Sequence, residues 1–94
     1  EIRARAALAA GRIGNEAAIS ALVNLLENDK IEKVRATAAF ALGEIESVKA
    51  ADAVLRGLQK GKNTDAVRAR LTEAAGKIAA ANAKDEKAKT LGEA

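Results

Sequence analysis

The sequence predicts an all-α protein, built as a solenoid of about three helical-hairpin repeats. Composition is the first indication: 49% of the 94 residues are hydrophobic, alanine is prominent among them, and proline is absent. Alanine is the strongest helix former and proline the strongest helix breaker. The second indication is internal repetition, because similar segments begin at Ile2, Val34 and Val67. Repetition at this period is typical of helical solenoids.

The three repeated segments are expected to be the first helices of the repeats. They read IRARAALAAGRIG at 2–14, VRATAAFALGEIE at 34–46 and VRARLTEAAGKIA at 67–79. Their apolar residues recur at steps of three and four, which is the helical period. Each segment carries a late glycine, although glycine costs about 1 kcal/mol relative to alanine inside a helix. We therefore expect a neighbouring helix to approach too closely for a Cβ at these positions.

A second helix is expected to follow each first helix. Asn15 can cap the segment NEAAISALVNLLEND, and Ser47 takes the same place before VKAADAVLRGLQKG. Gly61 is expected to stop the latter helix, in a stretch (57–64) that is a plain turn between helices. Asp65 is expected to cap the first helix of the third repeat.

The third second helix departs from the pattern. The segment NAKDEKAKTLGEA at 82–94 keeps only Leu91 as a large apolar residue. We expect a polar capping helix that frays beyond about Lys89, since the end repeats of solenoids are polar outside. The opposite edge is apolar from Ile2 onward, so we expect the chain either to be the C-terminal part of a longer array or to self-associate through residues 1–30.

The pattern resembles the HEAT repeats, specifically the short type called PBS-lyase HEAT-like repeats. The matching segments are VRATAAFALGEI at 34–45, ALVNLL at 21–26 and the longer GNEAAISALVNLL at 14–26. The resemblance implies a right-handed α-α superhelix. It implies a single domain over 1–94, with repeats at about 1–33, 34–66 and 67–94.

The resemblance also gives the recurrent arginine a structural role. In such repeats this arginine pairs with an acidic residue near the preceding turn and so links neighbouring repeats. We expect Asp29 to pair with Arg35, and Asp65 with Arg68. This reading is favoured over a ladder of phosphate-binding arginines because half-buried charges are normally paired.

A binding surface is a further implication of the resemblance. First helices line the convex side of such arrays, and second helices line the concave side, which commonly receives partners. Carried onto this chain, the solvent-facing stripe of the concave side consists of Ser20, Asn24, Glu27, Lys49, Asp52, Arg56, Gln59 and Lys60.

Composition argues against catalysis and against a cofactor. The chain has no His and no Cys, which excludes thiolate chemistry and the usual zinc ligands, and Phe40 is its only aromatic residue. We expect a non-catalytic protein-protein interaction scaffold without metal or cofactor, whose partner is another protein. A soluble protein is expected, because no apolar run is long enough to span a bilayer, and we favour the cytoplasm.

Two other functions remain open at this point. A subunit of the phycobilin-lyase kind, or another enzyme-associated subunit, is suggested by the name of the repeat type. Binding of duplex nucleic acid through a basic face is the other, since the net charge is +3. The absence of Trp and Tyr argues against stacking on single-stranded bases.

Overall fold

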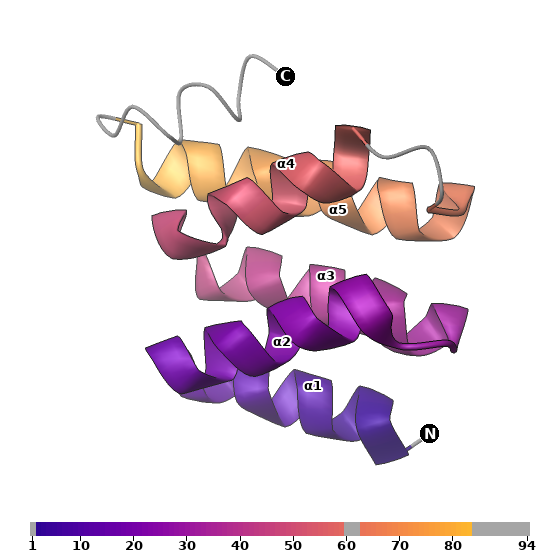
Figure 1. The fold of residues 1–94 in the computed structure, drawn as a ribbon. Coiled ribbons are helices and arrows are strands. Elements are labelled where there is room, and N and C mark those ends of the chain that lie inside the picture. Colours follow the sequence, from indigo (N-terminus) through magenta and orange to yellow (C-terminus); the bar gives the residue numbers. More distant parts are fainter. Residues whose placement is uncertain (1, 60–62, 84–94) are drawn as a thin grey trace.

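The computed structural model of the chain describes residues 2–59 and 63–83, and within them every regular element is a helix (Figure 1). The elements are α1 (Ile2–Ile13), α2 (Glu16–Asn28), α3 (Glu32–Ile45), the 3₁₀ turn η1 (Val48–Ala50), α4 (Ala51–Gln59) and α5 (Asp65–Ala81). The expected all-α solenoid is confirmed. The expected capping helix beyond residue 83, the stop at Gly61 and the side chain of Lys60 lie outside the described residues.

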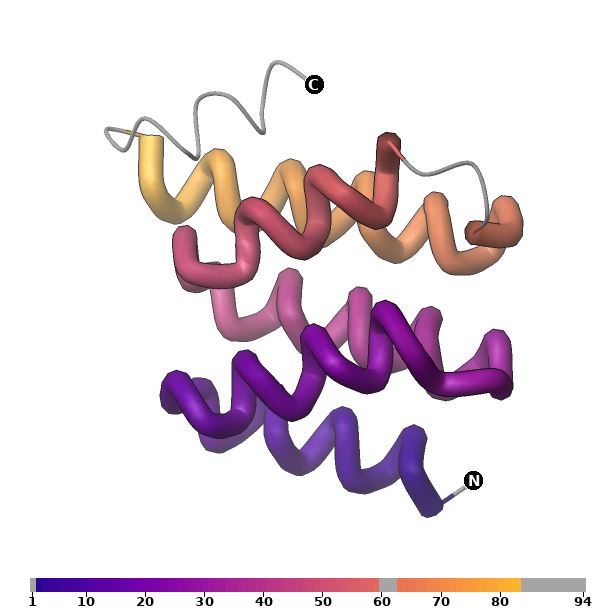
Figure 2. Tube along the Cα trace, viewed as in Figure 1, coloured from indigo at the N-terminus to yellow at the C-terminus, as the bar shows by residue number. Residues whose placement is uncertain are grey.

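The helices form two layers. The first helices α1, α3 and α5 are stacked in chain order, while α2 and α4 lie beside them in the second layer (Figure 2). Helix α3 is central, because it packs against α1, α2 and α5. The same helix-on-helix joint is therefore made twice in the first layer, once between α1 and α3 and once between α3 and α5.

Helix starts follow local side-chain chemistry. Asn15 caps α2 as predicted, because its Oδ1 accepts a hydrogen bond from the Ala18 N–H at 2.8 Å. Ser47 also acts as a cap, but for the short 3₁₀ turn η1 that leads into α4. The predicted cap at Asp65 is wrong. Thr64 is the N-cap of α5, and its backbone is extended. Asp65 is the first residue of α5, where its negative charge interacts favourably with the positive end of the helix dipole.

The core lies between the two layers. Its largest fully buried side chains include Leu22 from α2, Leu42 from α3, Val54 from α4, and Leu71 and Ile78 from α5. No polar or charged side chain is buried among the described residues. Each amphipathic helix therefore turns one apolar face inward, and solvent-facing positions remain for function.

The repeated glycines explain how closely the first helices approach. A Cβ added at Gly11 would lie 2.9 Å from the Ala41 Cβ. One added at Gly43 would lie 2.8 Å from the Ala74 Cα. The predicted close approach is thus confirmed at both internal joints. Gly76 differs, since no atom of the described residues lies within 4 Å of its added Cβ.

Candidate functional site

The recurrent arginines hold the ends of the second helices. The Arg35 Nη1 donates to the main-chain oxygen of Asp29 at 2.9 Å, and the Arg68 Nη1 donates to the main-chain oxygen of Leu58 at 2.8 Å. Carbonyls at the C-terminal end of a helix have no partner within the helix, and a cation there also offsets the helix dipole. Each arginine thus links its first helix to the end of the preceding second helix.

The predicted carboxylate pairs are not formed. The Asp29 carboxylate instead accepts from the Arg3 Nε at 2.8 Å and from the Ile31 N–H at 2.9 Å. Asp29 is the C-cap of α2, and its carboxylate accepts from the Ile31 N–H of the same turn. The group of Asp29 that faces Arg35 is therefore its main-chain carbonyl. Among the contacts of the described residues, Asp65 forms no ion pair with Arg68. The linkage between repeats holds, but its acceptors are main-chain oxygens.

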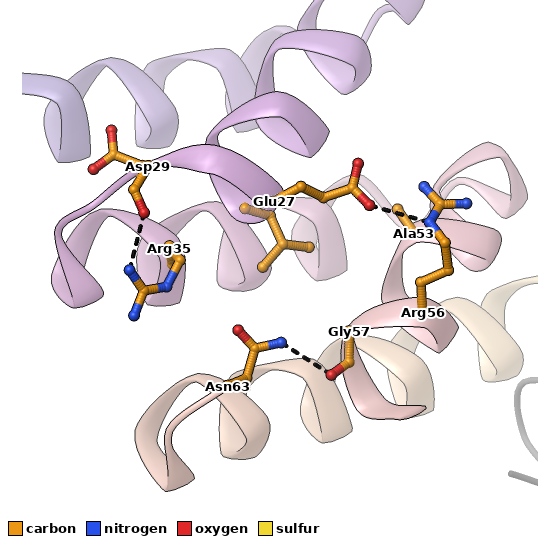
Figure 3. Close-up of a pocket in the computed structure, with 8 residues that line it drawn as sticks. Glu27, Asp29, Arg35, Ala53, Arg56, Gly57 and Asn63 are labelled. Carbon is orange, nitrogen blue, oxygen red and sulfur yellow. Dashed lines mark hydrogen bonds and ion pairs between the residues drawn. The ribbon is translucent and has the colours of Figure 1, made fainter. Parts of the chain in front are cut away.

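A cleft of about 290 Å³ opens beside these contacts, between the C-terminal half of α2 and α4 (Figure 3). Its apolar lining is buried and comes from Leu26, Ala53 and Gly57. Its polar lining consists of Glu27, Asp29, Arg35, Arg56 and Asn63. An apolar floor with a charged rim can receive a side chain that has an apolar stem and a polar tip.

Hydrogen bonds fix two walls of the cleft. The Arg56 Nε donates to the Glu27 Oε2 at 3.1 Å and so joins α4 to α2. The Asn63 Nδ2 donates to the main-chain oxygen of Gly57 at 2.9 Å, which holds the approach to α5 against α4. Figure 3 shows these two contacts and the Arg35 bond around one opening.

Arg35 differs from the other cations of the cleft region. Its guanidinium is half-buried, and its partner is a neutral carbonyl. No carboxylate of the described residues lies within ion-pair distance of it, whereas Arg56 is paired with Glu27. Arg35 is therefore the cation best able to take a negatively charged group from outside.

The predicted concave stripe is solvent-facing wherever the structure describes it. Its exposed members are Ser20, Asn24, Glu27, Lys49, Asp52, Arg56 and Gln59. Of these described members, Glu27 and Arg56 line the cleft. Lys49 forms an ion pair with Glu16 of α2, so part of the predicted basic character is neutralised within the chain.

Sequence reasoning missed part of the cleft. Gly57 and Asn63 belong to a stretch that was predicted to be a plain turn. Gly57 is buried, and a Cβ there would lie 2.8 Å from the Leu71 Cδ1. An asparagine that reaches six residues back to a helix carbonyl leaves no periodic signal, although asparagine is the usual residue for such local bonds.

Metal binding finds no support among the described residues, where no three His, Cys, Asp or Glu side chains are grouped to hold an ion. In the same part of the chain, no helix has the length and apolar character required to cross a membrane. The exposed polar face of α2 and α4, with its cleft, is the strongest candidate for recognition.

Comparison with known proteins bears on the architecture. A family model described as HEAT repeats matches residues 1–76. A comparison with curated proteins gave no match.

Proposed function

Because the chain belongs to the HEAT repeat family, we propose that it is a non-catalytic protein-interaction scaffold whose binding face is formed by α2 and α4. The PBS-lyase type of repeat, the repeat bounds at about 1–33, 34–66 and 67–94, and a concave shape of this face are part of the same proposal. The observation that carries it is the cleft between α2 and α4, whose walls come from two successive repeats.

The partner is a protein segment that presents an acidic side chain or a free C-terminal carboxylate. Arg35 supplies the charge, and a guanidinium binds a carboxylate with two parallel hydrogen bonds. Leu26 and Ala53 supply the apolar floor for the stem of that side chain. The Glu27 carboxylate on the rim repels a partner that places its acid there, so the acid is directed toward Arg35.

The same contacts favour protein over duplex nucleic acid as the partner. Phosphate binding needs several available cations on one face. Here Lys49 and Arg56 are paired with the carboxylates of Glu16 and Glu27 within the chain. Among the described residues that line the cleft, Arg35 is the cation without a carboxylate partner, and one such cation suits a single carboxylate better than a row of phosphates.

The bilin-binding alternative lacks an aromatic side chain at the cleft. Phe40, the one aromatic residue, lies on α3 with the Arg70 and Lys77 cations of α5 over its ring, at 5.9 and 5.1 Å from the centroid. It contributes nothing to the cleft lining. A mixed solution of chain and open-chain tetrapyrrole should show no change in the bilin absorbance.

Selection from a display library of short peptides tests the proposal. We expect the selected peptides to share an acidic residue or a free C-terminal carboxylate, and to lose at least about tenfold in affinity for an Arg35→Met chain, which is the loss expected for one charged contact. An Arg5→Met chain is the matched control, since Arg5 is exposed on α1 and outside the cleft. Peptides without an acid, or equal binding to the Arg35→Met chain, would refute the assignment of the cleft.

A further inference from the structure

We propose that Glu27 forms a second subsite of the cleft, which takes a basic side chain of the partner next to the carboxylate held by Arg35. The partner is then a segment that carries an acid and a base close together, and a segment with two neighbouring acids is disfavoured. This inference rests on the binding face proposed for α2 and α4, and it adds the charge pattern that this face selects.

The cleft holds two carboxylates, which differ in what they leave open. The Asp29 side chain is 7% exposed, and its carboxylate already accepts from the Arg3 Nε and from the Ile31 N–H. The Glu27 side chain is 34% exposed, and its Oε2 accepts from the Arg56 Nε at 3.1 Å. Its second oxygen, Oε1, is not used in that contact. Because a carboxylate has about four acceptor sites, Glu27 can still bind a donor from outside the chain.

A cation and an anion follow one another along the opening of the cleft. Figure 3 draws Glu27 between Arg35 and Arg56, and all three side chains line the cleft. A partner segment that is anchored at Arg35 therefore meets the Glu27 carboxylate before it reaches Arg56. The cleft measures only about 290 Å³. Charges bound in it thus lie within the Debye length of Glu27, which is about 10 Å at about 0.1 M salt.

Arg56 limits the size of the expected selection. Its side chain is bonded to Glu27 and is 46% exposed, so its positive charge offsets part of the field of that carboxylate. The remaining preference is that of one exposed charge pair, which corresponds to about twofold to fivefold in affinity. The same ion pair explains why a diacidic segment gains little. Its second acid has to displace Glu27 from Arg56, which exchanges one ion pair for another.

Paired substitutions in a bound peptide test the subsite. The probes are the acidic peptides selected on the native chain, with the anchoring carboxylate kept and each other position replaced in turn by Asp or by Lys. On the native chain we expect a position where the Lys peptide binds about twofold to fivefold more tightly than the Asp peptide. On a Glu27→Gln chain this preference should disappear or reverse, because the carboxylate is lost and Arg56 is left without its partner.

The direction of each change separates recognition from a loosened fold. Loss of the Glu27 charge should weaken binding of the Lys peptide and strengthen binding of the Asp peptide. A cleft that is only loosened would weaken binding of both. Salt gives a second readout that needs no variant. The preference of the native chain for the Lys peptide should shrink as ionic strength rises, since exposed charges are screened.

Glu16→Gln is the matched control. Glu16 is an exposed glutamate on the same helix, and its ion pair with Lys49 joins α2 to η1. It is not among the described residues that line the cleft. This variant therefore loses a comparable link between helices but should keep the preference for the Lys peptide. Circular dichroism checks that both variants have the helix content of the native chain.

Equal binding of the Lys and Asp peptides at every position on the native chain, or a preference that Glu27→Gln leaves unchanged, would overturn the inference. A preference for Asp would overturn it as well, because it would show that Arg56 releases Glu27 for a second acid. In each of these cases the anchor at Arg35 would still stand. If no acidic peptide binds, or if Arg35→Met binds equally well, the proposed binding face fails and this inference fails with it.

Discussion

The sharpest consequence of the repeated joint concerns one substitution at two equivalent positions. Gly43→Ala and Gly76→Ala add the same methyl group to the same repeat position in α3 and α5. At Gly43 the new Cβ meets the Ala74 Cα at 2.8 Å and its Cβ at 3.0 Å. At Gly76 it meets no atom of residues 2–59 and 63–83 within 4 Å. The two variants are therefore expected to change the free energy of unfolding in opposite directions.

The magnitudes follow from two opposing effects. Alanine in place of glycine inside a helix stabilises by about 1 kcal/mol, which Gly76→Ala gains in full. Overpacking costs about 1–3 kcal/mol, and at Gly43 the obstacle is main chain that moves only with its helix. Gly43→Ala should thus lose about 1 kcal/mol net, a difference of about 2 kcal/mol between the variants. For a domain of this size, each kcal/mol shifts Tm by about 4–8 °C.

Urea denaturation followed by circular dichroism at 222 nm measures the difference, at low protein concentration so that association plays no part. The Gly76→Ala chain serves as the matched control for the effect of helix propensity. If both variants are stabilised equally, the close approach of α3 and α5 is not what holds glycine at position 43, and the reasoning on the joint is refuted.

Three further predictions concern the core and the helix ends, all measured as shifts of the urea midpoint. Leu42→Ala should lose about 3 kcal/mol, because Leu42 is fully buried in the central helix, and a loss below 1 kcal/mol would contradict that packing. Asn15→Ala should lose about 1 kcal/mol through the missing cap of α2, whereas Asn15→Asp should keep most of it. Arg68→Met should lose about 1–2 kcal/mol, since the Leu58 carbonyl loses a charged donor while the apolar stem is retained; an unchanged midpoint would count against the linking role.

The periodic sequence pattern predicted most of the fold. The repeated segments predicted the first helices, and the glycine at each late position predicted the close joints later found at Gly11 and Gly43. Asn15 was predictable as a cap because its side chain bonds to a backbone N–H only three residues further along the chain. Asp65 was misassigned because Thr64 and Asp65 are both good N-caps, and sequence alone does not decide which residue has extended backbone.

The candidate site was only partly predictable, since its contacts join residues distant in sequence. Because Glu27 and Arg56 are charged, the sequence predicts that both lie on exposed helix faces. The ion pair between them depends on how α4 packs beside α2, which the sequence does not show. The expected pairing of Arg35 with the Asp29 carboxylate was wrong because the conformation at the end of α2 presents a carbonyl instead. The spacing of two residues in the sequence indicates that they lie close together. The backbone conformation decides whether a side-chain or a main-chain atom forms the hydrogen bond.

The most direct test of the proposed binding face is an amide-resolved NMR titration of the native chain with one selected acidic peptide. The proposal predicts that the largest shifts fall on Leu26, Arg35, Ala53 and Gly57, with the outer faces of α1 and α5 unchanged. Shifts that concentrate on α1 or α5 and spare the cleft would contradict the account.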